Sequence, residues 1–319
     1  MWSIMDKNIL YVEKYRPQVI DECILPEHLK KVFKEFTGQG KMPNLLLSGG
    51  AGIGKTTVAR ALCNELGYDV MFINCSEERG IDTLRTKMMR FCSTVSMTDD
   101  RKCLILDEAD YLTPDAQAAL RAFIEQFAST CSFVMTCNFK NRLIPPLHSR
   151  TTVIDFKISQ KEKATLCAGM MNRVMGICQE ENIEVEDKKV IAEVVMKYFP
   201  DFRRTLNEIQ RYSIGGRIDT GILAQIQELN TQDLIPAMRE RNFKVVRKWV
   251  SDNSDVEMSS LYRKLYDEFY QALDPTSSAI PQMVLHMAKY QYQSAFVPDQ
   301  DLNLTACLIE IMSDCKFKD

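Results

Sequence analysis

The sequence predicts an α/β domain built on a parallel sheet, followed by two helical regions. Three observations support this. Short apolar runs alternate with stretches of helical periodicity through the first half of the chain, as in a sheet covered by helices on both faces. A glycine-rich phosphate motif follows the first of these runs. Beyond about residue 157 the periodicity is helical and no clear strand is visible.

Five apolar runs predict the buried strands, because each is short, rich in Leu, Ile, Val or Phe, and bounded by polar residues. They are Leu45–Ser48, Val70–Asn74, Cys103–Asp107, Phe133–Asn138 and Thr152–Phe156. The stretches between them are expected to be helices. Residues 1–156 therefore form the expected α/β domain.

Two stretches show how the predicted helices begin and pack. Thr113 and Pro114 suit the N-cap and first position of a helix whose Ala116, Leu120, Phe123 and Phe127 would face the sheet. Near the C-terminus, Leu261, Leu265 and Phe269 recur at i, i+4 and i+8. We expect one helical domain over 157–228 and a second over 229–319.

The composition excludes several classes of protein. The chain has 319 residues, a net charge of −3, 45% hydrophobic residues and no run of 18 apolar residues, so it is expected to be soluble. Its start lacks the pattern of a signal peptide, which predicts a cytoplasmic location. The 11 cysteines and 3 histidines lack metal-ligand spacing, so buried thiols are expected rather than a zinc site or disulfides. Any nucleic acid would have to bind a local basic surface.

The phosphate motif is Gly49–Thr57, GGAGIGKTT, which fits G-x-x-x-x-G-K-[ST]. Glycines let backbone N–H groups wrap a phosphate, and the following helix N-terminus adds its positive dipole end. Lys55 would reach the β- and γ-phosphates, and the Thr56 hydroxyl would bind Mg²⁺. The alternative is a glycine-rich turn with a chance lysine.

Carboxylates at the end of a later strand supply the second half of a phosphate site. Asp107 ends a predicted strand and would hold Mg²⁺ through water, while Glu108 would polarise an attacking water. Asn138 ends the next strand and would reach the γ-phosphate or that water. The alternatives are an acidic N-cap cluster for the first two and a solvated strand end for Asn138.

In this setting the chain resembles the AAA+ ATPases, and more narrowly the sliding-clamp loaders. Tyr11–Ile24 is similar to the opening segment of replication factor C small subunits, and CSEERGID, LDEAD, AQAALRAFIEQ and HSRTT follow in the family's order. The resemblance covers about residues 10–228, and among loaders it is greatest to the large subunits of T-even-like bacteriophages. Asp107–Asp110 also spells the motif of an RNA helicase family, but Thr136-Cys137-Asn138 stands where those helicases have Ser-Ala-Thr.

The resemblance implies an AAA+ nucleotide-binding domain, a helical lid over 157–228 and an all-α collar over 229–319 that joins subunits. It also implies ATP and Mg²⁺ as cofactors. The residues that it places around the nucleotide are Val12, Glu13, Lys14, Tyr15, Ile24, Gly52, Ile53, Gly54, Lys55, Thr56, Thr57 and Arg203. Arg203 is favoured over its neighbour Arg204 as the lid residue that senses the γ-phosphate.

Further roles follow from the resemblance alone. Arg150, in Ser-Arg-Thr where the family has Ser-Arg-Cys, is expected to reach the ATP site of a neighbouring subunit. Gln117 and Arg121, at i and i+4, are expected to link neighbouring sites. The alternatives are a surface arginine and a solvated polar face.

A basic helix is expected to track DNA. Arg79 precedes a predicted helix over 80–92 and resembles the residue that couples DNA contact to Glu108. Arg85, Lys87 and Arg90 lie on the helix and suit backbone phosphates, although a solvated charged helix is the alternative. Met89–Val95 matches the family's clamp-contacting segment, and buried core is its alternative.

The predicted function is therefore that of an ATPase subunit of a DNA polymerase sliding-clamp loader. ATP binding would open the clamp and grip primer–template DNA, and hydrolysis would release the closed clamp on DNA. The expected partners are copies of the chain with at least one different loader subunit in a pentameric ring, the sliding clamp and primer–template DNA, but no membrane. The alternatives are another AAA+ DNA motor, such as a branch-migration helicase or helicase loader, and a non-hydrolysing scaffold subunit.

Overall fold

A computed structural model describes residues 10–77, 81–93, 101–221, 231, 233–253, 258–275 and 277–318. The chain divides into two compact units, Met1–Ala224 and Gln225–Asp319. Among the described residues, no helix is long and apolar enough to cross a membrane.

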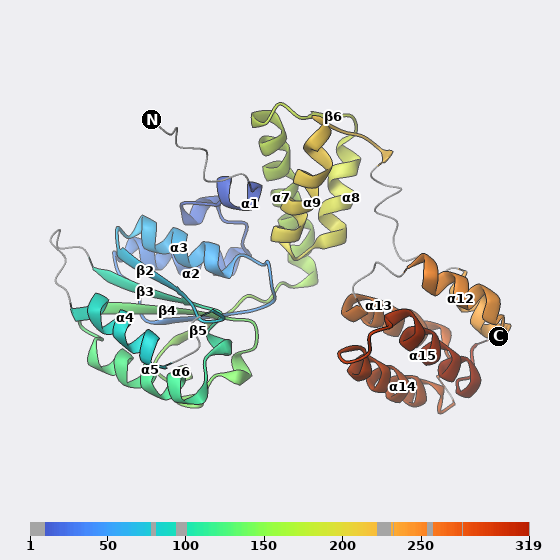
Figure 1. The fold of residues 1–319 in the computed structure, drawn as a ribbon. Helices are drawn as coiled ribbons and strands as arrows, with labels where there is room; N and C mark the ends of the chain where they lie inside the picture. The colour runs from blue at the N-terminus through green and yellow to red at the C-terminus, as the bar shows by residue number, and fades with distance from the viewer. Residues whose placement is uncertain are drawn as a thin grey trace, which may run out of the picture. The chain divides into compact units, whose positions relative to one another are not determined.

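A five-stranded sheet forms the centre of the first unit (Figure 1). Its order is β2-β3-β4-β1-β5, and every neighbouring pair is parallel. The strands are β1 Leu45–Ser48, β2 Asp69–Asn74, β3 Lys102–Asp107, β4 Cys131–Cys137 and β5 Thr152–Asp155. All five predicted strands and the parallel arrangement are confirmed.

Helices cover both faces of this sheet (Figure 1). Side chains alternate along a strand, so Leu45 and Leu47 pack with α2 and α3, whereas Leu46 between them packs with α4 and α5. The helices are α2 Glu27–Gly38, α3 Lys55–Glu65, α4 Ile81–Ser93, α5 Pro114–Gln126 and α6 Pro145–His148. The continuous apolar runs of the sequence reflect burial on both faces.

Helix α5 begins as its sequence predicts. The Thr113 hydroxyl accepts a hydrogen bond from the Ala116 N–H at 3.3 Å, and Pro114 takes the first helical position, where no N–H is needed. Leu120 and Phe123 are buried against the sheet. The N-cap hydroxyl thus fixes where the helix starts beside the end of β3.

Short helical turns connect these elements and shape the edge of the sheet. They are α1 Tyr11–Lys14, η1 Ile20–Glu22, η2 Ala109–Tyr111 and η3 Lys140–Arg142. Of these, η2 directly follows β3, and η3 follows β4.

The remainder of the first unit is a helical subdomain with one small sheet. Its helices are α7 Gln160–Glu180, α8 Lys188–Tyr198, α9 Phe202–Tyr212 and η4 Ser213–Gly215. Glu184–Val185 (β6) and Arg217–Ile218 (β7) pair in parallel, contrary to the expectation of no strand in this region. Strands of two residues leave no periodicity in a sequence, so only the tertiary structure reveals them.

The second unit is helical with one compact core. Its helices are α11 Leu234–Arg239, α12 Phe243–Asp252, α13 Met258–Ala272, α14 Ala279–Ser294 and α15 Gln300–Asp314. Leu261, Leu265 and Phe269 of α13 are all buried in it, as their spacing predicts. An isolated antiparallel bridge joins Leu273 to Phe317 after the last helix.

Adjacent aromatic residues of α13 provide a test of this core. Phe269 is 0% exposed and Tyr270 is 53% exposed. We expect Phe269→Ala to lower the free energy of unfolding by about 3–5 kcal/mol, because it removes buried surface and leaves a cavity. Tyr270→Ala should lower it by less than about 1.5 kcal/mol, because the side chain is half exposed and what it loses includes a ring contact with Tyr266. Denaturant titration followed by Trp249 fluorescence measures both; equal losses would contradict the packing.

Candidate functional site

A cavity opens at the carboxyl edge of the sheet. Its empty volume, which includes open space at its mouth, is about 1030 Å³. It is lined by the opening segment 12–25, the loop 51–54, the start of α3, the ends of β3 and β4, and α7 and α9. Segments up to about 190 residues apart in sequence therefore meet around one space.

The loop between β1 and α3 needs glycine for two different reasons. Gly52 and Gly54 have φ of +68° and +98°, in the left-handed region that side chains rarely adopt. Gly49 instead lies so close to Phe156 that an added Cβ would come within 2.8 Å of the Phe156 Cβ. These constraints keep the loop tight and aim the N-terminus of α3 at the cavity.

Lys55 lies at this N-terminus with its ammonium fully engaged. The residue is 8% exposed, and its Nζ donates to the carbonyls of Gly49 and Gly50 at 2.8 and 2.7 Å and to Asn138 Oδ1 at 2.8 Å. Burial lowers the pKa of Lys55, and the nearby carboxylates of Asp107 and Asp110 partly offset that effect. An anionic ligand would therefore meet a desolvated cation already pointed at the loop.

Asp107, at the end of β3, accepts hydrogen bonds from two hydroxyl groups on one carboxylate oxygen. Thr56 Oγ1 and Thr136 Oγ1 each donate to Asp107 Oδ1 at 2.6 Å. The Thr136 hydroxyl also accepts from the Glu108 N–H at 3.1 Å. Thr136 is 1% exposed, so its two hydrogen bonds are buried. They connect Asp107 and Glu108 to β4. The motifs did not single out Thr136, which acts only through its place beside β3.

Glu108 has an unusual backbone conformation beside the cavity. Its φ and ψ are 55° and 44°, the left-handed region, where a residue other than glycine costs about 1–3 kcal/mol. Glu108 lines the cavity next to Asp107. Such conformations concentrate at functional sites, where surrounding contacts hold them.

Asp110, the fourth residue of the Asp-Glu-Ala-Asp stretch, forms a hydrogen bond to the residue that follows Asn138. Asp110 is buried, and its Oδ2 accepts from the Phe139 N–H at 3.1 Å, directly after Asn138. This bond ties η2 to the end of β4 and fixes the turn that presents Asn138. Asn138 in turn lines the cavity and contacts Lys55.

The opening segment contributes fewer residues than expected. Val12, Tyr15 and Ile24 line the cavity, but Glu13 and Lys14 do not. Glu13 instead bonds Arg16, at 3.2 Å to its Nε, and Lys14 pairs with Glu181 at 2.7 Å. A helical turn puts positions 12 and 15 on one face and leaves 13 and 14 on the other, so a contact of Glu13 or Lys14 with a nucleotide stays a prediction.

Helix α7 anchors this opening segment. Tyr15 Oη donates to Glu181 Oε1 at 2.5 Å, and burial, with Glu181, raises the pKa of Tyr15 to about 12. Arg173 donates to the carbonyls of Tyr15 and Glu22 at 3.1 and 2.8 Å. Arg173 also lines the cavity, as do Met170 and Arg16. No local pattern marks Arg173 or Met170, whereas Arg16 lies inside a segment already singled out.

Helix α9 brings Arg203 to the cavity and docks on the glycine loop. The Phe202 N–H donates to the Gly52 carbonyl at 3.1 Å, and a Cβ on Gly52 would come within 1.7 Å of Asp201 Oδ1. Arg203 lines the cavity, whereas the Arg204 guanidinium lies 4.9 Å from the centre of the Tyr198 ring. The two adjacent arginines thus have different surroundings.

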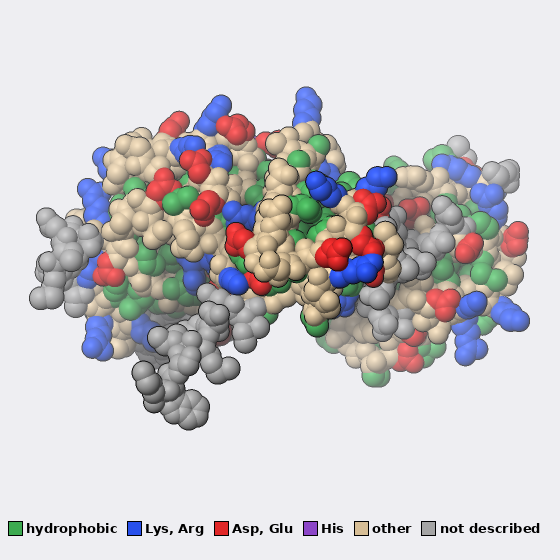
Figure 2. Space-filling view, turned by 90° about the horizontal axis from the view of Figure 1, so that it is seen from above, with side chains coloured by type: hydrophobic (Ala, Val, Ile, Leu, Met, Phe, Trp, Pro, Cys, Tyr) green, Lys and Arg blue, Asp and Glu red, His purple; other side chains and the backbone are tan. Residues whose placement is uncertain are grey.

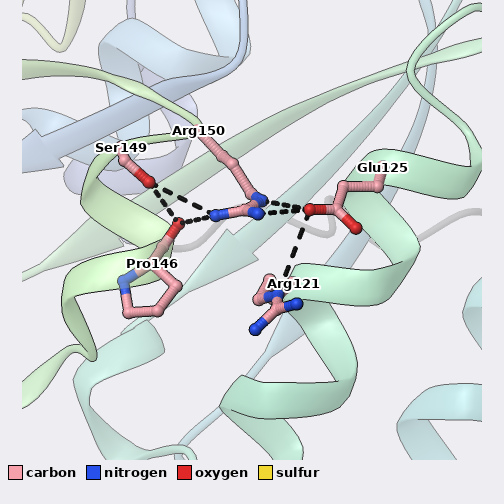
Figure 3. A network of polar contacts seen from close by, with 5 residues as sticks. All are labelled: Arg121, Glu125, Pro146, Ser149 and Arg150. Atoms are coloured by element: carbon pink, nitrogen blue, oxygen red, sulfur yellow. Dashed lines mark hydrogen bonds and ion pairs between the residues drawn. The ribbon is translucent and has the colours of Figure 1, made fainter.

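Arg150 does not line this cavity; it lies in a polar network on its own chain (Figure 3). Its Nε donates to Glu125 Oε1 at 2.6 Å, and its Nη1 donates to the Pro146 carbonyl at 2.9 Å. Its Nη1 also donates to Ser149 Oγ at 3.3 Å. The side chain remains 28% exposed.

Gln117 and Arg121 do not act on one another within the chain. Gln117 is 3% exposed; its Nε2 donates to the carbonyls of Leu112 and Arg142, and its Oε1 accepts from the Ile144 N–H. Arg121 points outward and lies 4.0 Å from Glu125 (Figure 3). Burial turns Gln117 inward, where it satisfies three backbone groups, and its expected role with Arg121 between neighbouring sites stays a prediction.

The basic residues of α4 are exposed. This holds for Arg85, Lys87 and Arg90, while Arg79 lies outside the described residues. Met89 of the expected clamp-contacting segment is 37% exposed, and its residues 94 and 95 also lie outside the described ranges. Basic and acidic side chains are mixed over the face seen in Figure 2, in keeping with the small net charge.

Oxygen donors gather at Thr56 and Asp107, where the hydroxyl donates to the carboxylate. Within the described ranges, no group of three or more His, Cys, Asp or Glu side chains could hold a metal ion. All 11 cysteines are free thiols, ten of them buried. One carboxylate and one hydroxyl suit a magnesium ion that takes its remaining ligands from water and a nucleotide's phosphates.

Comparison with known proteins identifies the family. Residues 45–159 match the model of the ATPase family associated with various cellular activities, and residues 162–224 match that of the sliding-clamp-loader large subunit, AAA+ ATPase lid domain. The chain is 33% identical to the sliding-clamp-loader large subunit of Enterobacteria phage T4 over 100% of both chains. It belongs to the clamp-loader family of AAA+ ATPases.

Further relatives agree with this assignment. The large subunit of Escherichia phage RB69 is 38% identical over 88% of each chain. The replication factor C small subunit of Sulfolobus acidocaldarius is 37% identical over 67% of this chain and 66% of its own. A solved structure of a RuvB mutant from Thermogota maritima superimposes with a TM-score of 0.53 at 19% identity, covering 66% of this chain and 71% of its own, and shows the fold alone. Membership of the AAA+ ATPases implies that the chain binds nucleotide and acts as an ATPase.

The Thr136 hydroxyl offers a test of the site's construction. We expect Thr136→Val to lower the free energy of unfolding by about 1–3 kcal/mol, because the Glu108 N–H and Asp107 would each lose a buried partner. Thr136→Ser keeps the hydroxyl and should retain most of the stability. Denaturant titration of both variants measures the difference; equal loss in the two would mean that the methyl group, not the hydroxyl, matters.

Proposed function

We propose that this chain is the ATPase subunit of a DNA polymerase sliding-clamp loader, in which ATP binding opens the clamp and hydrolysis releases it on primer–template DNA. The observation that carries the proposal is the convergence of Lys55, Asp107, Glu108 and Asn138 at one cavity. It occurs in a chain related over its whole length to a sliding-clamp-loader large subunit.

The cavity suits ATP with Mg²⁺. At the phosphate end, Lys55 and the N–H groups of the loop through Gly52, Ile53 and Gly54 would bind the β- and γ-phosphates. Thr56 and Asp107 would hold the magnesium ion, which neutralises phosphate charge when bound. Asp107 Oδ1 accepts a hydrogen bond from the Thr56 hydroxyl, so that contact would open as the ion binds.

Hydrolysis needs a positioned water, and two residues are placed to hold one. Glu108 would accept a hydrogen bond from the water and raise its nucleophilicity, and Asn138 would orient it or the γ-phosphate. The hydroxyl of Thr136 and the carboxylate of Asp110 keep these two side chains at the edge of the sheet.

The other end of the cavity suits an adenine ring. Val12, Ile24 and Met170 supply apolar surface, and the Tyr15 side chain also lines the cavity. Thr57, which accepts from Arg16 Nη1 at 3.2 Å, lies on the first turn of α3 between the two ends of the cavity. Binding would therefore engage the opening segment, the sheet edge and α7 together.

The partners follow from family membership and from charge. We expect copies of the chain and at least one different subunit to form a pentameric ring through the collar over 229–319. Arg85, Lys87 and Arg90, with Arg79, would contact DNA phosphates, and Gln117, Arg121 and Arg150 would couple neighbouring subunits. The bacteriophage relatives favour a host cytoplasm as its location. The alternative of another AAA+ DNA motor is not favoured, because these relatives are clamp-loader subunits.

The proposal is tested by steady-state ATP hydrolysis of the complete assembly with its clamp, with and without primer–template DNA. We expect primed DNA to stimulate hydrolysis, because it completes sites shared between subunits. Arg150→Ala should remove most of the activity, since such arginines are worth about 10³–10⁵ in rate, while nucleotide binding is retained.

Hydrolysis that ignores primer ends, or displacement of a DNA strand, would instead support a DNA motor. Full activity in Arg150→Ala would contradict a role for Arg150 between subunits. Nucleotide affinity, measured with a fluorescent ATP analogue, separates loss of catalysis from loss of binding.

The adjacent arginines of α9 form a matched pair for a second test. We expect Arg203→Ala to weaken ATP binding at least about tenfold, because it removes a charge-assisted contact to phosphate. Arg204→Ala should change affinity less than about threefold, since its guanidinium lies against Tyr198. Titration with a fluorescent ATP analogue gives both constants; the reverse order would assign the sensing role to Arg204.

A further inference from the structure

Arg150 is held on its own chain by Glu125, a residue of α5 to which the sequence analysis assigns no role (Figure 3). Both Nε and Nη2 of the guanidinium donate to the same carboxylate oxygen, Glu125 Oε1, the former at 2.6 Å. On its other side, Nη1 donates to the Pro146 carbonyl and to Ser149 Oγ. The side chain is thus fixed from two directions.

These contacts use most of the donors that a phosphate would need. A guanidinium carries five N–H groups, and four are engaged here, one on Nε, one on Nη2 and two on Nη1. Arginine binds phosphate through two parallel N–H groups. Arg150 must therefore give up a partner, and the adjacent carboxylate also offsets its positive charge.

A second arginine stands beside the same carboxylate oxygen. Arg121 Nε lies 4.0 Å from Glu125 Oε1, one helical turn away, and both side chains are 50% exposed. Arginine before glutamate is the weaker order for such a pair, so Arg150 remains the main partner. If the Arg150 side chain moves away from Glu125, the Arg121 guanidinium can move closer to the Glu125 carboxylate. The carboxylate then keeps an ion-pair partner.

We propose that Glu125 is a positioning residue that holds Arg150 on the free chain and passes to Arg121 when Arg150 turns to the phosphate of a neighbouring copy. The inference rests on the proposed function of Arg150 between subunits. An exposed ion pair contributes little free energy, so Glu125 does not block assembly. It sets the concentration at which neighbouring copies complete each other's sites.

The test is the dependence of ATP hydrolysis on subunit concentration in the complete assembly with clamp and primed DNA. We expect Glu125→Gln, which keeps the shape and removes the charge, to lower the half-maximal concentration about two- to fivefold. The rate at saturation should stay unchanged. Asp115→Asn removes the same charge from an exposed position at the other end of α5 and should not shift the midpoint.

The exchange of partners needs a second comparison. Arg121→Gln should raise the half-maximal concentration, because Glu125 would have no replacement for Arg150. In the Glu125→Gln background the same change should have no further effect. An effect of Arg121→Gln that persists there would mean that Arg121 acts elsewhere, and the exchange would be overturned.

The outcomes separate this inference from the proposed function. Wild-type activity in Arg150→Ala would overturn both the role of Arg150 between subunits and the role of Glu125. Loss of activity in Arg150→Ala together with an unchanged or raised midpoint in Glu125→Gln would overturn only the role of Glu125. A lowered midpoint in Glu125→Gln with no shift in Asp115→Asn would support it.

Discussion

The site depends on the position of β4 between β1 and β3. Because all three strands are parallel, their carboxyl ends meet at one edge of the sheet. The Thr136 hydroxyl can then reach Asp107, and Asn138 can reach Lys55. Neighbouring strands thus turn three separate sequence motifs into one connected set of hydrogen bonds.

The second constraint is that the sheet edge supplies only one side of the cavity. Arg173 holds the backbone of the opening segment from α7, and the Phe202 N–H docks α9 on the Gly52 carbonyl. A nucleotide would contact both sides at once, so its binding energy would depend on the angle between the sheet and these helices. That dependence would link the nucleotide state to the arrangement of subunits in the proposed assembly.

The buried Lys55 and the partly exposed Arg150 are paired in different ways. Lys55 is buried, and each of its three donors meets an oxygen, because an unpaired buried cation would be costly. Arg150 is partly exposed and shares one carboxylate with Arg121 (Figure 3). The buried contacts fix geometry, whereas the exposed pair is weak enough to exchange partners.

The sequence by itself determined the parallel α/β fold, the phosphate loop and the carboxylates at the end of β3. Strands buried on both faces are continuous apolar runs, and a phosphate loop requires glycines and a lysine at fixed spacing, so both can be recognised in a short stretch of sequence. It also predicted the start of α5 from Thr113 and Pro114. Only the tertiary structure decided which residues meet across the chain. It brought Thr136 and Arg173 to the site, turned Glu13 and Lys14 away from it, and paired Arg150 with Glu125. These contacts depend on strand order, on the face of the helix and on burial. They join residues that are far apart in the chain, so a short stretch of sequence does not predict them.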